Sequence, residues 1–397
     1  MARFSASERH VLALTGVAHA ATHFAELVYP TLAVVLARDT GIPLEHVLGW
    51  SFAGYLLFGL GALPAGYLAD RLGERRLVLG GLVGMGLAAG AAGASRPGAP
   101  LAAALAVLGL AASVYHPAGM ALISRAVRAR GRALGVNGIF GSLGIAGTPV
   151  VTAVVAQRFG WQATFLGSGV VLLAFAAVLA RLPIAARSAP AAAARAPAIR
   201  TTTAAAAALN LAAVFSGIVY RAGTIAQPAY FAERVAVVGF GAATTLAYLM
   251  GVLGQWVGGL VADHRDLRWS YFAFHLATVP ALLVMSRTHG ATLLVAAAVF
   301  TFAGLGMQPI ENSLFAHFTP ARWRSTGFGV KFVLSSGVGS LGVWLVRAVR
   351  EAWGMAAVFQ VLAVVVGLLL ATILVLVALT GEREREPAGA LGEAPFA

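Results

Sequence analysis

The stretch Gly66-Tyr67-Leu68-Ala69-Asp70-Arg71-Leu72-Gly73-Glu74-Arg75-Arg76 decides the fold, because it gathers five charged residues between two long apolar segments. Residues 56–69 and 77–94 contain no charged residue at all. Apolar segments of this kind suit the hydrocarbon interior of a bilayer, and charges between them mark its surface. The stretch therefore predicts a tight turn between two membrane-spanning helices.

The composition of the whole chain agrees with this interpretation. Of 397 residues, 59% are hydrophobic and 11% are charged, and the mean hydropathy is +0.83. Soluble domains carry about a quarter charged residues, so the composition predicts a polytopic membrane protein. The net charge of +13 does not indicate a nucleic-acid partner, because the arginines lie in short loops between apolar segments. The absence of cysteine excludes disulfides and thiolate metal sites.

Twelve apolar segments of helical length follow one another along the chain, separated by charges or by glycine and proline. We therefore expect an all-α membrane protein with twelve transmembrane helices. The approximate spans are 10–37, 46–69, 76–95, 99–125, 132–157, 161–182, 204–232, 239–262, 268–287, 291–318, 325–349 and 354–380.

The arginines predict the orientation in the membrane. If the N-terminus is cytoplasmic, nineteen arginines fall on the inner side and seven on the outer side. Cytoplasmic loops carry the excess of basic residues, so we expect both termini in the cytoplasm. The expected location is the inner membrane of a bacterial cell, crossed many times and in contact with the lipid bilayer.

The chain also contains an internal repeat. The segment 66–70 (Gly-Tyr-Leu-Ala-Asp) returns as 259–263 (Gly-Leu-Val-Ala-Asp), and Gly135-Val136 returns as Gly329-Val330 at nearly the same shift. Two such echoes indicate a duplication, so we expect two pseudo-symmetric six-helix bundles. The expected boundaries are 1–182 for the first bundle, 183–203 for a cytoplasmic linker, 204–380 for the second bundle and 381–397 for a disordered cytoplasmic tail.

The opening stretch resembles the loop signature of the major facilitator superfamily, Gly-x-Leu-x-Asp-Arg-x-Gly-Arg-Arg. Glu74 stands where that family usually carries a basic residue. The resemblance implies a cytoplasmic gate in which the acid helps to latch the two halves together. The residues that it assigns to this gate are Gly66, Asp70, Arg71, Gly73, Arg75, Arg76 and, from the repeat, Asp263.

Two further elements resemble efflux proteins of the same superfamily. Tyr115-His116-Pro117 and the histidine-rich first helix are similar to the fosmidomycin-resistance branch of drug-efflux proteins. The run Gly138, Gly141, Gly144 and Gly147 before Pro149 partly matches a glycine pattern of family antiporters, although close helix packing alone would account for it. These resemblances imply export.

The first apolar segment carries three reactive side chains, His19, His23 and Glu26, at spacings of four and three residues. This spacing places them on one stripe of a helix, at a depth where ionisable groups are costly and usually functional. One interpretation is proton coupling, because histidine titrates near neutral pH. A second is divalent-metal binding by the His-x3-His pair with the carboxylate. A third is that these groups only hold helix packing.

Other polar residues inside apolar segments complete the candidate site. Glu26, Glu311 and His23 are the candidate proton-coupling residues. Arg221 stays charged, so it favours an anionic or carbonyl-rich ligand, or else it neutralises Glu311 or Glu26. Lys331 either contacts substrate or snorkels to the cytoplasm. The candidate substrate-binding residues are His19, His116, Tyr220, Arg221, Gln255, Gln308 and Asn312.

The sequence contains none of the usual nucleophile, phosphate-loop or zinc motifs of enzymes. These observations predict a secondary active transporter and not an enzyme. We expect a monomer that moves a small organic solute by alternating access in proton-coupled efflux, with no cofactor. One alternative is uptake or export of a divalent metal or its chelate. The other is a non-transporting membrane sensor on the same fold.

Overall fold

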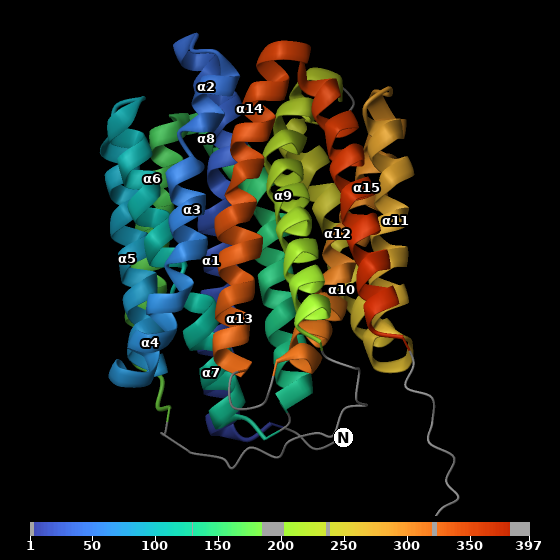
Figure 1. Cartoon of the computed structure of the whole chain (residues 1–397). Coiled ribbons are helices and arrows are strands. Elements are labelled where there is room, and N and C mark those ends of the chain that lie inside the picture. The colour runs from blue at the N-terminus through green and yellow to red at the C-terminus, as the bar shows by residue number, and fades with distance from the viewer. Residues whose placement is uncertain (1–3, 129, 185–201, 236–238, 320–323, 382–397) are drawn as a thin grey trace, which may run out of the picture.

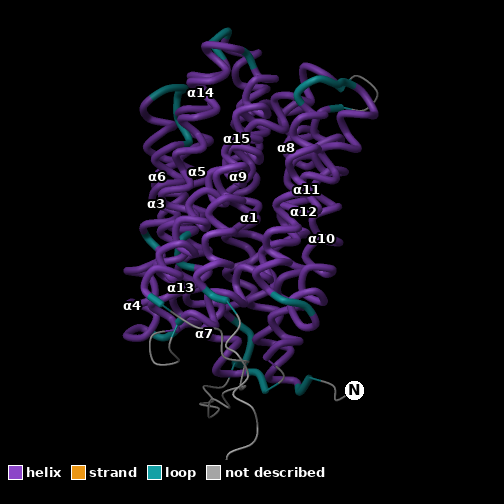
Figure 2. Tube along the Cα trace, turned by 45° about the vertical axis from the view of Figure 1, so that its right-hand side comes forward, coloured by secondary structure: helices purple, strands orange, loops and turns teal. Residues whose placement is uncertain are grey.

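The computed structural model describes residues 4–128, 130–184, 202–235, 239–319 and 324–381. Every regular element in these ranges is a helix, and the helices run side by side along one long axis (Figure 1, Figure 2). The all-α prediction is therefore confirmed. Nearly all of the predicted linker 183–203 and of the predicted tail 381–397 lies outside the described residues, so these boundaries stay predictions.

The first half of the chain forms eight helical pieces. Several of them are parts of one bent crossing, as in the pair that meets at Gly61 with a bend of 46°. The pieces are α1 (Ala6–Thr40), α2 (Leu44–Gly49), α3 (Phe52–Leu60), α4 (Ala62–Leu72), α5 (Glu74–Ala94), α6 (Ala99–Ala112), α7 (Tyr115–Ala126) and α8 (Arg130–Ala180).

The second half of the chain is built in the same way. One crossing is interrupted at its centre by a π-helical turn, η2, and a 3₁₀ turn, η3. The elements are α9 (Thr203–Arg234), α10 (Phe240–His264), α11 (Leu267–Met285), α12 (Gly290–Phe318), α13 (Arg324–Phe332), η2 (Val333–Gly337), η3 (Val338–Ser340), α14 (Leu341–Trp353) and α15 (Met355–Leu379).

These helices make twelve membrane crossings. Ten helical stretches among the described residues are long and apolar enough to span a bilayer, and the bent pair 44–60 and 62–72 adds another. The last crossing arises because α8 contains two spans. Gly160 has φ +85°, which ends one helix and turns the chain into the next. The predicted number of crossings, six in each half, is therefore confirmed.

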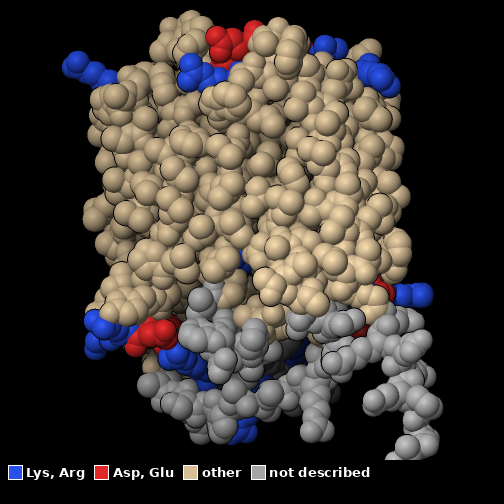
Figure 3. Space-filling model, viewed as in Figure 1, with Lys and Arg blue, Asp and Glu red and all other residues tan. Residues whose placement is uncertain are grey.

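The surface has the charge distribution of a membrane protein. The visible face is an uncharged band, and the Lys, Arg, Asp and Glu side chains gather at its two ends (Figure 3). Large apolar side chains face outward within the band; Val170, for example, exposes 67% of its surface. Since a water-soluble fold would bury such side chains, this band is the part of the surface that suits lipid.

The opening stretch forms the expected turn. The helix α4 ends at Leu72, Gly73 adopts φ +88°, and α5 begins at Glu74. This backbone conformation favours glycine, because an added Cβ would strain it. The turn lies at the same end of the molecule as the N-terminus, near α7 and α13 (Figure 1).

A second charged turn precedes α11. The Asp266 carboxylate caps this helix by accepting hydrogen bonds from the backbone N–H groups of Arg268 (2.8 Å) and Trp269 (3.2 Å), and it pairs with the Arg268 guanidinium at 2.6 Å. Partial burial raises the pKa of the Asp266 carboxyl, but these hydrogen bonds and the Arg268 charge outweigh burial and hold the pKa below its ordinary value. Arg268 also donates to Thr380 at the end of α15.

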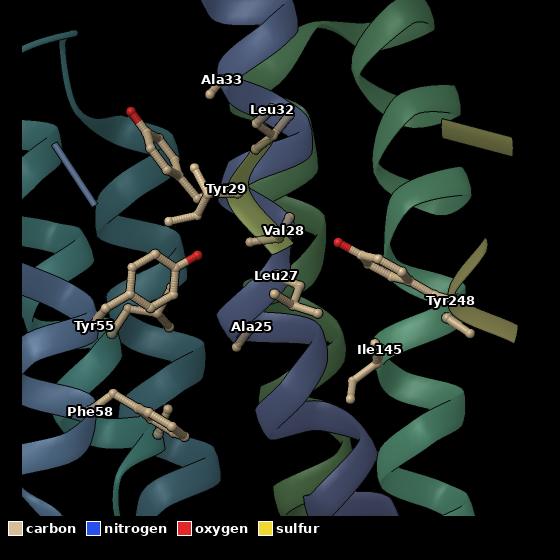
Figure 4. Packing of buried hydrophobic residues seen from close by; sticks show 14 of the residues in the cluster. Ala25, Leu27, Val28, Tyr29, Leu32, Ala33, Tyr55, Phe58, Ile145 and Tyr248 are labelled. Carbon is tan, nitrogen blue, oxygen red and sulfur yellow. The ribbon is translucent and has the colours of Figure 1, made fainter. Parts of the chain in front are cut away.

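The helix α1 runs through the centre of the packed interior. In Figure 4, Leu27 and Val28 of α1 lie between Tyr55 on one side and Ile145 and Tyr248 on the other. The buried hydroxyls of Tyr55 and Tyr248 donate to the backbone carbonyl oxygens of Glu26 (2.9 Å) and Thr224 (3.1 Å). The core thus satisfies these polar groups and fixes α1 against its neighbours.

Glycines bring backbones into close contact at the interrupted crossing, both across the two halves and within the second half. A Cβ added to Gly59 of α3 would lie 2.0 Å from the backbone nitrogen of Gly337 in η2, and one added to Gly217 of α9 would lie 1.9 Å from the carbonyl oxygen of Ser335. Such close contacts exclude any side chain at these positions. The π-helical turn is therefore packed backbone to backbone against both α3 and α9.

Candidate functional site

The predicted stripe on α1 forms a continuous chain of contacts. The Nδ1 atom of His23 lies 2.8 Å from Oε2 of Glu26, and Nε2 of His23 lies 3.2 Å from Nε2 of His19. The Nδ1 atom of His19 lies 2.8 Å from the backbone carbonyl oxygen of Asn137 in α8. An added Cβ on Gly141 of α8 would lie 2.4 Å from the His19 ring, so this glycine makes room for the imidazole.

These contacts restrict which ring nitrogens carry protons. A carbonyl oxygen only accepts, so the 2.8 Å contact with Asn137 is a hydrogen bond when Nδ1 of His19 carries the proton. The amide nitrogen of Asn137 lies 3.1 Å from the same Nδ1 and donates to it in the other tautomer. A carboxylate accepts, so Nδ1 of His23 donates to Glu26. Nε2 of His23 then accepts, and Nε2 of His19 donates to it in the Nε2–H tautomer.

A third histidine completes this cluster. His116, at the start of α7, brings its ring to 5.3 Å from that of His19 and 5.4 Å from that of His23, centroid to centroid. One ring nitrogen of each of the three histidines lies within 4.8 Å of the others. His116 stacks on Phe332 of the second half at 4.6 Å. The histidine cluster, His19, His23 and His116, therefore lies at the boundary between the halves.

Glu26 also joins the two halves directly. Its Oε1 atom pairs with Nη2 of Arg221 in α9 at 2.5 Å, and only 2% of each side chain is exposed. The Arg221 guanidinium lies over the ring of Tyr55, 3.6 Å from its centroid. Its Nε and Nη1 atoms have no hydrogen-bond partner among the described residues. The pair links the first helix of each half, and of the two expected partners for Arg221 the structure selects Glu26.

A second buried ion pair lies entirely in the second half. The ammonium group of Lys331 in α13 lies 2.8 Å from Oε1 of Glu311 in α12, and Oε2 of Glu311 accepts a hydrogen bond from Tyr271 at 2.7 Å. Lys331 also donates to Asn312. Because 7% of Lys331 is exposed, it does not snorkel to the cytoplasm. Its partner, Glu311, is one of the two acids that we assigned to proton coupling.

The remaining predicted substrate-binding residues are more dispersed. Gln255 of α10 donates to Gln308 of α12 at 3.1 Å, which pairs two of them within the second half. The ring centroid of Tyr220 lies 5.7 Å from the Arg221 guanidinium carbon. The candidate residues thus form three groups: the histidine cluster with Glu26 and Arg221, the Glu311 pair with Asn312, and the two glutamines.

The predicted gate residues surround the turn after α4. Asp70 pairs with Arg125 of α7 at 2.9 Å, and Glu74 pairs with the same guanidinium at 2.6 Å. Both acids therefore bind within their own half in this structure. Asp263, the repeat counterpart, is exposed and has no ion pair among the described residues. Latching of the two halves by Asp70 stays a prediction.

Other gate residues brace the same turn. Arg75 donates to the carbonyl oxygens of Ala180 (2.7 Å) and Leu182 (3.0 Å) at the end of α8. The Arg71 guanidinium lies over the ring of Tyr67, 4.3 Å from its centroid. The other predicted members are Gly66, Gly73 and Arg76, and they lie in the same turn and the helix ends beside it.

An ionic contact closes the opposite end of the molecule. Arg350 of α14 pairs with Glu45 of α2 in the first half and with Glu233 of α9, the latter at 3.3 Å. The helices α2 and α14 lie side by side at the end of the molecule away from the N-terminus (Figure 1). We call this contact the outer clasp. It joins the halves at one end, while the histidine cluster lies deeper along α1.

Sequence reasoning missed three residues of the site. Tyr55, Tyr271 and His275 contact the buried charges or lie beside them, and Tyr271 packs edge-on to His275 with centroids 4.7 Å apart. His275 was detectable, since an ionisable residue inside an apolar segment is a functional candidate by default. The two tyrosines gave no such signal, because tyrosine is common in buried helices.

Comparison with known proteins gives a family match and several partial relatives. The family model described as Major Facilitator Superfamily matches residues 12–343. The chain is 31% identical over 143 residues to the methylenomycin A resistance protein of Bacillus subtilis (strain 168), covering 34% of this chain and 30% of that protein. It is 32% identical over 156 residues to the methyl viologen resistance protein SmvA of Salmonella typhimurium (strain 14028s), covering 38% of this chain and 30% of that protein.

A solved structure agrees over nearly the whole chain. A POT family transporter in complex with 5-aminolevulinic acid superposes with a TM-score of 0.74, covering 94% of this chain and 96% of that one at 12% identity. At this identity the likeness concerns the fold alone. The matches to the two resistance proteins span less than a third of their length, so they bear on a part of each protein.

Proposed function

Because this chain belongs to the major facilitator superfamily, we propose that it is a secondary active transporter that exports a small organic solute in exchange for protons. The family is one of transporters rather than enzymes. The direction rests on the two partial relatives, which are both named for resistance to a toxic compound. A panel of toxic organic solutes that includes both charged and uncharged compounds is therefore the first to test.

The contact between Glu26 and Arg221 carries the proposal. It joins α1 to α9 across the two halves and is buried beside the histidine cluster. Alternating access requires the halves to move relative to each other, and a contact between them must then change. A proton that reaches His23 or Glu26 would weaken the hold of the carboxylate on the guanidinium. Proton binding would thereby bias the equilibrium between the two states.

The Glu311–Lys331 pair is the second proposed proton site. It resembles the first pair in chemistry, since an acid is held by a cation and by a second donor, here Tyr271. It lies within one half, so its protonation would act on packing between α12 and α13. We propose that the turn around Asp70 forms the inner gate and that the outer clasp holds the structure closed at the other end.

The test is gradient-driven transport in proteoliposomes with an imposed pH difference. Solute-dependent collapse of the gradient is read with a pH-sensitive dye for the wild type, Glu26→Gln, Glu311→Gln and His23→Gln. Glu351→Gln, which removes an exposed acid at the end of α14, is the matched control. We expect coupled transport to fall at least about tenfold in Glu26→Gln and to persist in the control.

Correct folding is checked by a monodisperse elution profile and an unchanged helical signal. Coupled transport that persists in Glu26→Gln, Glu311→Gln and His23→Gln would contradict the proton assignment. Solute exchange that continues without a gradient in these variants would support the proton assignment, because the variants would then have lost only the coupling of transport to protons. The test also separates the transporter from a non-transporting sensor, which would move no solute in either assay.

Transport of a divalent metal is the second candidate function. It is favoured by the three ring nitrogens of the histidine cluster, which lie within 4.8 Å of one another. Imidazole suits Zn²⁺ and Ni²⁺, and the metal would here be cargo. Raised thermal stability with Zn²⁺ that is lost in His19→Ala and in His23→Ala would support this function. No stabilisation at any concentration of Zn²⁺ would exclude it.

The cellular setting follows from the same proposal. We propose that the protein acts as a monomer in the inner membrane of a bacterium, with both termini in the cytoplasm. The support is the excess of arginine in the loops on the side of the N-terminus. Protease protection of the N-terminal and C-terminal ends in sealed right-side-out vesicles tests the orientation.

A further inference from the structure

A cavity lies inside the second half, beside the groups described above. It comprises about 460 Å³ of space that no atom fills, part of it open to the outside, between α9, α10, α11 and α12, with Ile145 of α8 at one side. None of its lining residues is Asp, Glu, Lys or Arg. We call it the α9–α12 cavity.

Three lining side chains have polar atoms without a hydrogen-bond partner among the described residues. They are both ring nitrogens of His275, Oε1 of Gln227 and Oγ1 of Thr301. Each of these residues is at least nine-tenths buried: the exposed fraction is 2% for His275, 1% for Gln227 and 5% for Thr301. Buried polar groups are normally paired, and leaving them unpaired is costly. Three such groups around one cavity indicate a ligand that pairs with them.

Two other hydroxyls of the lining are already bonded elsewhere. The hydroxyl of Thr278 donates to the carbonyl oxygen of His275 at 2.7 Å, and that of Tyr248 donates to Thr224 at 3.1 Å. These donors are already engaged with backbone. A neutral imidazole offers one donor and one acceptor, a threonine hydroxyl offers both, and Gln227 Oε1 accepts.

We propose that the α9–α12 cavity binds the transported solute, and that this solute is uncharged, with an amide-like or hydroxyl group on an aromatic or apolar body. The polar group would pair with His275, Gln227 and Thr301. The body would contact the rings of Tyr248 and Phe300, which line the same space. A charged solute would meet no counter-charge among the lining residues. This inference rests on the proposed transport function and names its substrate class.

The cavity lies between the two buried ion pairs. On one side, His275 packs against Tyr271, whose hydroxyl donates to Glu311. On the other side, Thr224 lines the cavity and donates to the backbone carbonyl oxygen of Arg221 at 3.0 Å. A solute in the cavity would therefore contact residues that are neighbours of both pairs. Occupancy and protonation would act on the same helices without a direct contact between solute and charge.

Binding is tested with the protein in lipid nanodiscs, using acetanilide as the probe and isothermal calorimetry as the readout. Acetanilide carries one N–H donor and one carbonyl acceptor on an aromatic ring. Ethylbenzene is the apolar control, and phenyltrimethylammonium is the charged control of similar size. The variants are His275→Leu and the near-isosteric Thr301→Val, and the matched control is His289→Gln, which changes an exposed histidine before α12.

We expect saturable binding of acetanilide that weakens about tenfold or more in His275→Leu and in Thr301→Val, as loss of one buried hydrogen bond implies. Binding should be unchanged in His289→Gln. The inference is overturned if acetanilide does not bind saturably, if either control probe binds as tightly, or if neither cavity variant weakens binding. Thr301→Val guards against a folding defect in the larger substitution.

The outcome is independent of the proton test. Calorimetry needs no gradient, so a failure to bind acetanilide alongside normal gradient-driven transport would remove only the cavity assignment. Normal binding alongside proton-independent transport in the wild type would remove only the coupling assignment.

Discussion

Loss of either partner in the Glu26–Arg221 contact should destabilise the protein more than loss of any surface ion pair. A guanidinium cannot deprotonate, so in Glu26→Gln the cation stays buried. Its Nε and Nη1 atoms already have no hydrogen-bond partner in the described part of the chain, so the guanidinium would keep chiefly its contact with the ring of Tyr55. Removing one partner of a buried pair costs about 3–5 kcal/mol. We expect a loss of this size in Glu26→Gln and in Arg221→Met.

The double variant separates pairing from packing. Glu26→Gln combined with Arg221→Met removes both charges and leaves a side chain of similar length in α9. We expect the loss in the double variant to be smaller than the sum of the single losses by at least about 2 kcal/mol. Such a difference would measure the coupling between α1 and α9 directly.

The assay is reversible unfolding by sodium dodecyl sulfate in mixed micelles, followed by the helical circular-dichroism signal. Asp39→Asn is the control, because Asp39 pairs with Arg38 at 2.9 Å while 39% and 65% of the two side chains are exposed. An exposed pair contributes about 0–1 kcal/mol. Single variants that lose no more than this control, or losses that simply add in the double variant, would refute the reasoning.

Three further predictions concern other parts of the chain. Arg350→Ala should open the outer clasp and lengthen spin-label distances between the outer ends of the two halves; unchanged distances would show that the clasp is not needed. Asp266→Ala should cost about 1 kcal/mol at neutral pH. Because the folded pKa of Asp266 lies below the unfolded one, its contribution is present above the ordinary pKa and is lost as pH falls, so unfolding titrations of variant and wild type should converge in acid. Gly144→Ala should lower thermal stability, since its Cβ would lie 2.3 Å from the carbonyl oxygen of Ala20, whereas Gly147→Ala has open space and should not.

Much of the fold could be predicted because it depends on local patterns. The charged turn at 66–76 and the lengths of the apolar runs were sufficient for the twelve crossings, since bilayer thickness fixes the length of a span. The two internal breaks differ in how predictable they were. The break at Gly160 falls between the predicted spans 132–157 and 161–182, whereas the π-helical turn at 333–337 depends on contacts with Gly59 and Gly217, which no local pattern indicates.

The site was predictable only as a set of residues. Helical spacing placed His19, His23 and Glu26 on one stripe, and the structure shows them in contact. The partner of Glu26 is 195 residues away, and no local pattern distinguished Arg221 from Lys331 as its cation. That choice depends on how the two halves pack, so only the three-dimensional structure makes it.

The Glu26–Arg221 contact also has a consequence for biogenesis. The ribosome completes α1 long before α9, so the acid is already in the membrane when the arginine-bearing helix arrives. An arginine at the centre of an inserting helix costs about 2.5–3.5 kcal/mol on insertion scales. Glu26 can offset this cost only if α1 is already in the membrane when α9 inserts. We therefore expect residues 202–381, expressed alone, to insert α9 poorly and to be rescued by co-expression of the first half, whereas Arg221→Met should insert without help. Equal insertion in all three cases would show that translation order is irrelevant here.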